Sequence, residues 1–293
     1  MKQLFTALIT PFDESLNIDF SALETLIDQQ INAGVHGLVI LGTTAEAELL
    51  SHDEQLLLVD FVCQKANGRI KITVGCGKSS TLETLRLAIE FMKFPVKNVM
   101  VVMPPYVKPD RRGLYEHFKL ISNESIPFIA YHHPGRTGLN PSIETLESIL
   151  SLPSCQGLKD ASGGCDVMKA LACDYTIYSG DDSMLIPHLS LGASGIISVC
   201  SHIIPEAFLH ILEHFTIDPV HALKYFKNYL GLIDAIFKEP NPVGIKAALS
   251  LKGTIQNFVR PPYMSAASDN LQNLSQILDT YVQPNDVQVD LTI

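Results

Sequence analysis

The chain has 293 residues, of which 46% are hydrophobic and 18% are charged, and its formal net charge is −10. This composition predicts a folded protein with a sizeable core and excludes disorder, because disordered chains are rich in charge and poor in apolar residues. The acidic balance, with Lys and Arg scattered along the chain, argues against nucleic acid as a partner.

The N-terminal residues contain no signal-peptide core, and no apolar run approaches the roughly 18 residues that cross a bilayer. We therefore expect a cytoplasmic protein that does not associate with a membrane. The six cysteines include no C-x-x-C pair. We interpret them as reduced core or edge thiols rather than as zinc ligands.

Short apolar runs recur along the chain, and each is followed by turn residues and then by an amphipathic stretch with apolar spacing of three and four. The runs predict eight strands: Phe5–Ile9, Gly37–Leu41, Ile70–Gly75, Asn98–Met103, Pro127–Tyr131, Gly157–Lys159, Thr176–Ser179 and Gly195–Val199. The amphipathic stretches predict eight helices near residues 21–33, 52–66, 81–93, 113–123, 142–151, 165–172, 183–190 and 205–214. Ser51–Glu54 and Ser80–Glu83 both have the Ser-x-x-Glu pattern of a capping box.

Strands that alternate with helices predict right-handed crossovers and a parallel sheet. Eight such units favour closure into a (β/α)8 TIM barrel over an open sheet. Beyond the last strand, three more helices are predicted near residues 219–237, 241–252 and 265–281. We therefore expect residues 1–217 to form a barrel that carries the active site, and residues 218–293 to form a C-terminal helical subdomain.

Barrel enzymes place their reactive groups at the C-terminal ends of the strands. Lys159 ends the sixth predicted strand, where inward-pointing residues are normally apolar. Burial can lower the pKa of a lysine until its free amine attacks a ketone and forms an imine. The alternative is a salt bridge at the barrel mouth, with Asp160 or Glu46 as the partner.

Other strand ends also carry groups suited to chemistry. Tyr131 ends the neighbouring strand, where a phenol could relay protons or could simply pack. Thr43 and Thr44 follow the second strand and could hold a carboxylate, although Gly-Thr-Thr is also an ordinary turn. Arg136 lies in the loop after Tyr131, where its guanidinium could bind a second carboxylate or remain a surface charge.

The dipeptide His132–His133 suggests a metal site. Neighbouring strand residues point to opposite faces, however, and no other Asp, Glu or His has a spacing that would complete a ligand set. We therefore expect no metal at this position.

Taken in order, these motifs resemble the pyruvate-dependent Schiff-base lyase family, and within it the dihydrodipicolinate synthase branch. The similarity covers nearly the whole chain, in six segments: Leu8–Phe12, Gly42–Glu46, Tyr131–Gly138, Gly157–Ser162, Gly192–Ser198 and Asn241–Pro242. The resemblance implies condensation of pyruvate with L-aspartate 4-semialdehyde, in the route to diaminopimelate and lysine. It also implies a homo-oligomer that needs no metal, flavin, nicotinamide or added pyridoxal.

Carried over position by position, the resemblance implies four catalytic roles. Lys159 would form the imine, and Tyr131 would be the central proton relay. Thr43 would link Tyr131 to Tyr106, which reaches the site across a tight dimer interface from the other subunit. A dimer is therefore expected, with a tetramer as the usual assembly of the family.

The resemblance also implies the substrate contacts. Thr43 and Thr44 would hold the pyruvate carboxylate, with the Ile197 carbonyl nearby, and Arg136 would bind the carboxylate of the aldehyde. An arginine in this loop favours the synthases, because the sialic-acid lyases of the family lack it. Two alternatives stay open: a related lyase for a sugar acid or keto-acid, and a barrel that binds a carboxylate without turnover.

The chain departs from the family pattern at a few positions. Ala45 stands where Gly is usual, and its side chain disfavours the positive φ that Gly allows. His132–His133 stands where Asn-Val is common.

Inhibition by lysine, which is frequent in the synthases, is expected to be weak or absent here. Part of the family's lysine-binding set is retained, in His52, Gly77 and Glu83. The rest is replaced, at Ala47, Glu48, Gln55 and Pro105.

Overall fold

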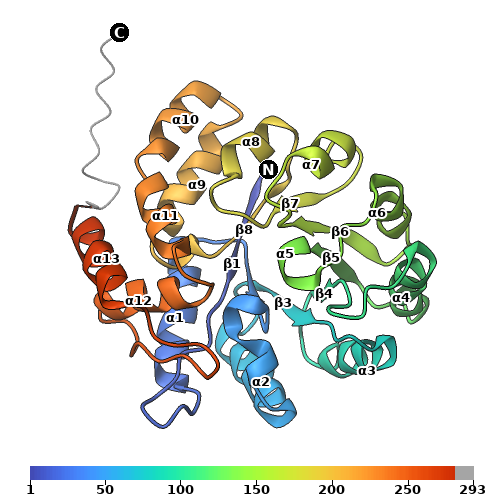
Figure 1. Cartoon of the computed structure of the whole chain (residues 1–293), viewed down its shortest axis with the longest axis horizontal. Coiled ribbons are helices and arrows are strands. Elements are labelled where there is room, and N and C mark those ends of the chain that lie inside the picture. Colours follow the sequence, from blue (N-terminus) through green and yellow to red (C-terminus); the bar gives the residue numbers. More distant parts are fainter. Residues whose placement is uncertain (281–293) are drawn as a thin grey trace.

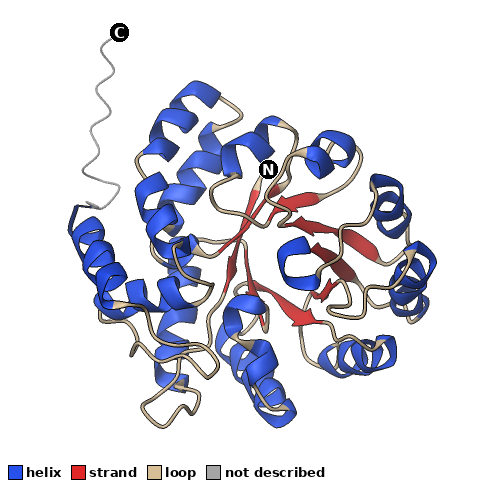
Figure 2. Ribbon diagram, in the orientation of Figure 1, coloured by secondary structure: helices blue, strands red, loops and turns tan. Residues whose placement is uncertain are grey.

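The structure is a computed structural model that describes residues 1–280, in which eight parallel strands close into a barrel in chain order (Figure 1). The strands are β1 Gln3–Ala7, β2 Gly37–Ile40, β3 Lys71–Cys76, β4 Asn98–Val102, β5 Phe128–His132, β6 Cys155–Asp160, β7 Ile177–Ser179 and β8 Gly195–Ser198. Figure 2 shows the strands at the centre with helices arranged around them. The predicted (β/α)8 barrel is confirmed.

The outer ring is formed by helices that follow the strands in turn. They are α1 Phe20–Ala33, α2 His52–Ala66, α3 Thr81–Phe91, α4 Arg111–Asn123, α6 Ile143–Leu150, α7 Asp166–Leu171, α8 Leu185–Ser190 and α9 Pro205–His214. Four short helices were not predicted: η1 Thr43–Ala45, η2 Ala47–Leu49, α5 Pro134–Thr137 and η3 Cys200–His202. Each is only three or four residues long and follows a strand end, so it is too short to produce a helical period.

The helices beyond the barrel are α10 Pro219–Lys227, α11 Leu230–Phe237, α12 Val243–Leu251 and α13 Ser268–Thr280. The single helix predicted over residues 219–237 is wrong, because two helices occupy that segment. Tight bonds from Asn228 N to Tyr225 O (3.1 Å) and from Tyr229 N to Phe226 O (2.9 Å) end α10. The apolar spacing continues through the break, so the pattern does not reveal it.

The two predicted capping boxes have different outcomes. The box at Ser51 is complete, because its hydroxyl accepts from Glu54 N and the Glu54 carboxylate accepts from Ser51 N. At the second site the Ser80 hydroxyl accepts from Glu83 N at 3.4 Å. The Glu83 carboxylate instead pairs with Arg86 at 3.2 Å, so the reciprocal half of that box was predicted wrongly.

A buried ion pair ties the C-terminal helices to the barrel mouth. The Lys246 ammonium on α12 donates to the Glu46 carboxylate between η1 and η2, and both side chains are fully buried. The second Glu46 oxygen accepts from Arg260 N at 2.8 Å. A buried pair of this kind is costly to break, because removal of one partner leaves an uncompensated charge. The loop after β2 therefore depends on residues near the end of the chain.

The predicted division at residue 217 stays a prediction, and residues 281–293 of the expected subdomain lie outside the described residues. Among the described helices, none has the length and apolar character that a membrane crossing requires. All six cysteines are free thiols; Cys63, Cys76 and Cys200 are buried, whereas Cys173 is exposed.

Candidate active site

Lys159 and Tyr131 are direct neighbours across the β5–β6 pairing. Because they share a rung, their side chains leave the sheet on the same face. The Lys159 ammonium lies over the Tyr131 ring, 4.5 Å from its centroid. Lys159 is only 6% exposed, and the Tyr131 side chain is also buried. The two strands thus hold an amine and a phenol together in a desolvated position.

The salt-bridge alternative for Lys159 is wrong, since both candidate carboxylates have other partners. Glu46 is occupied by Lys246 and by the backbone of Arg260. Asp160 points away from Lys159 along the strand, and its carboxylate contacts the His132 Nδ1 at 2.9 Å. Among residues 1–280, no ion pair involves the Lys159 amine.

A third buried carboxylate, Asp182, lies near this end of the barrel. It accepts hydrogen bonds from the Ser198 hydroxyl and from the backbone N–H groups of Val199 and Cys200, the latter two at 3.1 Å. Its charge favours the protonated form of Lys159, but it makes no contact with the amine within ion-pair distance.

Burial lowers the pKa of Lys159 to about 8, and the Arg136 guanidinium acts in the same direction against the opposing charge of Asp182. With that pKa, about a tenth of the amine is free at pH 7, compared with almost none for an ordinary lysine. Burial raises the pKa of Tyr131 to about 12, although a hydrogen bond with the Thr43 side chain opposes the rise. At neutral pH the site therefore contains a buried amine that is partly deprotonated, beside a protonated phenol.

The loop after β2 positions the two threonines. Leu41 adopts a left-handed φ of 52° at the strand end, and its carbonyl lies only 2.1 Å from where a Cβ of Gly75 would be. Only glycine at position 75 lets the chain turn there. Thr43 then lies beside Tyr131, and Thr44 is buried, its hydroxyl accepting from the Asn241 amide at 2.9 Å.

The concern about Ala45 is resolved by the local backbone. Ala45 lies in the 3-10 helix η1, and the left-handed conformation falls on the next residue, Glu46, with φ 55°. A side chain at position 45 is therefore tolerated. The Ala45 carbonyl also accepts from the Thr10 hydroxyl at 2.8 Å, which fixes this loop to the end of β1.

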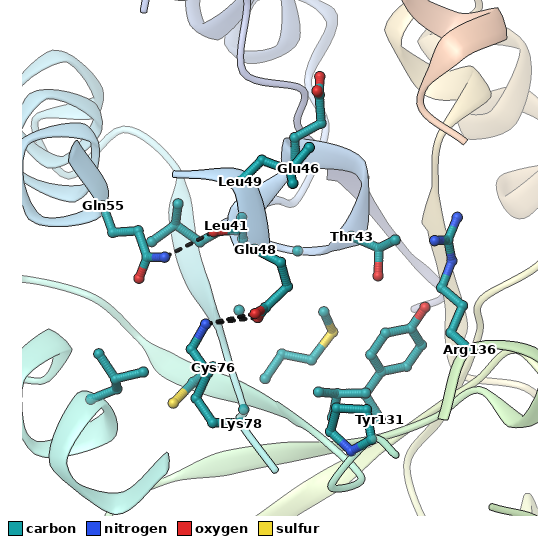
Figure 3. A pocket seen from close by; sticks show the side chains of 18 of the residues that line it. Leu41, Thr43, Glu46, Glu48, Leu49, Gln55, Cys76, Lys78, Tyr131 and Arg136 are labelled. Carbon is teal, nitrogen blue, oxygen red and sulfur yellow. Dashed lines mark hydrogen bonds and ion pairs between the residues drawn. The ribbon is translucent and has the colours of Figure 1, made fainter. Parts of the chain in front are cut away.

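Arg136 lies on α5, above Tyr131. Its guanidinium donates to the Asn241 carbonyl at 2.9 Å and to the Tyr263 hydroxyl at 3.4 Å. The side chain remains exposed, and a guanidinium has five N–H donors, so several are left for a ligand. Figure 3 shows the Thr43 hydroxyl and the Tyr131 phenol directed toward each other, with Arg136 beside them.

These residues line a cavity of about 320 Å³. From Tyr131 and Arg136 it extends past Thr43 toward β3, where Lys78 and Glu48 form an ion pair (Figure 3). Tyr131 lines this cavity, and Lys159, whose amine lies over the Tyr131 ring, does not.

Among the described residues, no side-chain hydrogen bond or ring contact joins Tyr106 or Ile197 to the other predicted site residues. Tyr106 is 89% exposed and has a left-handed φ of 72°, so its ring does not enter the site of its own chain. Ile197 is buried in β8 and is registered with Phe5 of β1. Its predicted role through the backbone carbonyl is untested.

The structure adds three residues that the sequence pattern did not identify. Asn241 contacts both Thr44 and Arg136, although it was only part of a family motif, and Tyr263 contacts Arg136. Neither lies near a strand end in the sequence. Gly180 follows β7, where a Cβ would lie 2.9 Å from the Lys159 Cε. Glycine is needed there to leave room for the lysine.

The metal interpretation of His132–His133 finds no support in the geometry. His132 faces Asp160, whereas the ring of His133 packs against Tyr131. Over residues 1–280, no group of three or more His, Cys, Asp or Glu side chains is arranged to hold a metal ion.

A barrel with a desolvated lysine beside a phenol, and an exposed arginine at its mouth, is typical of proteins that form imines with keto-acids. A model of the dihydrodipicolinate synthetase family matches residues 1–281. The chain belongs to this family, as its motifs predicted. The 4-hydroxy-tetrahydrodipicolinate synthase of Oceanobacillus iheyensis is 36% identical over 285 residues, covering 95% of this chain and 97% of that protein.

Solved structures agree with the sequence comparison. The chloride-inhibited dihydrodipicolinate synthase of Acinetobacter baumannii in complex with pyruvate has a TM-score of 0.92 and 32% identity, covering 95% of this chain and 98% of that one. The enzyme of Cyanidioschyzon merolae with lysine bound has a TM-score of 0.90 and 32% identity, covering 95% and 97%. These relatives support a synthase over a sugar-acid lyase or a non-catalytic barrel.

The lowered pKa of Lys159 can be measured without any substrate. Because burial lowers the folded-state pKa, the amine should lose its proton as the pH rises through about 8, rather than near 10.5. An NMR titration of the lysine Cε–Hε signals would show this midpoint. Burial also lowers the pKa of Lys246 to about 8, so the resonance must be assigned as the one missing from Lys159→Arg. A Lys159 midpoint of 10 or above would contradict the prediction.

Proposed function

We propose that this protein is a 4-hydroxy-tetrahydrodipicolinate synthase that condenses pyruvate with L-aspartate 4-semialdehyde in the cytoplasm. The observation that carries the proposal is the buried Lys159 amine, which has no carboxylate partner and lies over the Tyr131 ring. Relatives with this activity by name at 36% identity give it further support.

The first half of the reaction uses the amine and the phenol. The Lys159 amine attacks the ketone carbon of pyruvate, and loss of water gives an imine. Tyr131 carries protons to and from the oxygen that leaves as water, because its raised pKa keeps the phenol protonated between transfers. Transfer of a proton from the methyl carbon to the imine nitrogen then gives the enamine, whose carbon is the nucleophile.

The second half joins the aldehyde to the enamine. The enamine carbon bonds to the aldehyde carbon, and the aldehyde oxygen takes a proton and becomes a hydroxyl. The amine of the second substrate then attacks the imine carbon and closes the ring, which expels Lys159 as the free amine. Lys159 is therefore the covalent catalyst, and its own regeneration completes the cycle.

The substrate carboxylates have separate binding groups in this proposal. Thr43 and Thr44, with the Ile197 carbonyl nearby, hold pyruvate on the β2 side of the mouth. Arg136 binds the carboxylate of the aldehyde, since Asn241 and Tyr263 fix one side of its guanidinium and leave other donors free.

We also propose a homo-oligomer, in which at least two chains complete each other's site. The exposed Tyr106 ring supports this, because a large aromatic side chain with 89% exposure in one chain is suited to a partner. Its phenol would reach Thr43 of the partner and extend the proton relay from Tyr131. Pairing of dimers into a tetramer is expected from the family.

Borohydride reduction with pyruvate tests the proposed chemistry. The wild-type protein should gain one pyruvate-derived adduct on Lys159, detectable by mass spectrometry. Lys159→Ala should form no adduct, and Lys159→Arg should be equally inactive, because a guanidinium stays protonated and is not a nucleophile. A coupled assay should show turnover with aspartate semialdehyde and none with N-acetylneuraminate. Undiminished trapping in Lys159→Ala would refute the mechanism.

Arg136→Ala should weaken the use of the aldehyde but not the trapping of pyruvate. Loss of a charge-assisted carboxylate contact costs roughly 1.5–3 kcal/mol, so kcat/KM for the aldehyde should fall by about tenfold to a hundredfold. Trapping of pyruvate should persist. If trapping and aldehyde use fell equally, Arg136 would be holding the loop rather than the substrate.

Lysine should inhibit this enzyme weakly or not at all. Glu48 is already paired with Lys78, at 2.8 and 2.9 Å, and the Gln55 amide donates to the Ala47 and Leu50 carbonyls. The Glu48 carboxylate and the Gln55 amide therefore already have partners within the chain and are not free to bind lysine. Each hydrogen bond that the bound lysine lacks lowers its binding free energy by roughly 1.5–3 kcal/mol. Titration of activity with lysine is the measurement. Strong, cooperative inhibition below a millimolar concentration would contradict the prediction.

A further inference from the structure

His133 is the first residue after β5, and its side chain continues the alternation of that strand. Its ring packs edge-to-face against Tyr131, with centroids 5.8 Å apart and an interplanar angle of 65°. The intervening His132 points to the opposite face and contacts Asp160. His133 therefore lies on the same face of the barrel mouth as Tyr131 and Lys159.

The surroundings of His133 keep its imidazole neutral. Burial lowers the pKa of this side chain to about 4, and the charges of Arg136 and Lys159 act in the same direction. Both cations therefore lie close enough to influence the ring, although among the described residues no hydrogen bond joins the ring to either of them. A neutral imidazole has one N–H donor and one acceptor lone pair.

The backbone of His133 is fixed, whereas its ring has no polar partner. The His133 carbonyl accepts from the backbone N–H of Thr137 and from its hydroxyl, both at 3.0 Å. The ring Nδ1 is buried and has no hydrogen-bond partner among the described residues. The ring as a whole is only half-buried, and its other nitrogen, Nε2, is not among the buried unpaired atoms of the described residues, so Nε2 is the atom open to a ligand.

We infer that His133 is a substrate-contacting residue, whose imidazole hydrogen-bonds to an oxygen of the second substrate between the Lys159 amine and the Arg136 guanidinium. The inference rests on the proposed function. The contact belongs to the aldehyde rather than to pyruvate, because His133 is three residues from Arg136, whereas the threonines proposed for pyruvate lie on the loop after β2.

Attack of the enamine on the aldehyde is helped by a hydrogen-bond donor at the aldehyde oxygen, and it requires no additional charged group. As the enamine carbon bonds to the aldehyde carbon, the carbonyl electron pair moves onto the aldehyde oxygen. The imidazole N–H donates a hydrogen bond to that oxygen and keeps its proton, so the carbonyl is oriented and polarised. A neutral imidazole supplies this donor without adding a charge beside Lys159, and Arg136 already provides a cation for the carboxylate of the aldehyde.

His133→Val tests the inference, because valine keeps an apolar side chain against Tyr131 but has no hydrogen-bonding group. His133→Asn restores a donor at nearly the same place. We expect His133→Val to lower kcat/KM for aspartate semialdehyde by about tenfold, with the rate of pyruvate trapping within about twofold of wild type. His133→Asn should recover part of the loss. His214→Val, on α9 away from the barrel mouth, is the matched control and should behave as wild type.

Three results would overturn the inference. The first is unchanged kcat/KM for the aldehyde in His133→Val. The second is an equal loss of pyruvate trapping and aldehyde use, which would mean that His133 supports Tyr131 or Lys159 rather than the substrate. The third is a wild-type protein that traps pyruvate but does not turn over the aldehyde, which would remove the proposed function and this inference together. An intact melting temperature separates all three from a folding defect.

Discussion

The site depends on one constraint, which is the burial of an amine without a carboxylate beside it. A lysine at a strand end would normally recruit an anion, and an ion pair would keep the amine protonated. Here the nearby carboxylates have other partners. Glu46 is held by Lys246, Asp160 by His132, and Asp182 by Ser198 and two backbone N–H groups. The reactivity of Lys159 is thus a property of the whole polar network at the barrel mouth.

The same network explains why the helices beyond the barrel belong to the active site. Lys246 on α12 neutralises Glu46, whose loop carries Thr43 and Thr44. Asn241 joins Thr44 to Arg136, and so links a loop after β2 to a loop after β5. In Figure 1 α10 lies beside α9, and α12 and α13 lie beside α1. Asn241 before α12 and Arg260 after it nevertheless contact the loops at the mouth. The barrel supplies the reactive groups, and the C-terminal segments fix the loops that carry the binding groups.

The sequence was sufficient for the barrel and for the reactive pair, because both follow from local rules. Short apolar runs located every strand, the helical spacing located the outer helices, and the strand-end rule selected Lys159 and Tyr131. Contacts between residues that are far apart in the sequence could not be predicted in this way. Asn241 and Tyr263 lie more than a hundred residues from Arg136, and nothing in their local sequence indicates the contact. The φ of Glu46 was also missed, because the expected strain was assigned to Ala45.

The departure of this chain from its family at His132–His133 gains a physical meaning from the alternation of β5. One imidazole leaves the strand on each face. The outward ring of His132 engages Asp160, which follows Lys159 directly and would otherwise be the nearest carboxylate in the sequence. The inward ring of His133 packs on Tyr131, which lies beneath the Lys159 amine. The two adjacent residues therefore serve different faces of the sheet: His132 pairs with Asp160 on the outer face, and His133 places an uncharged polar group on the face that carries Tyr131 and Lys159.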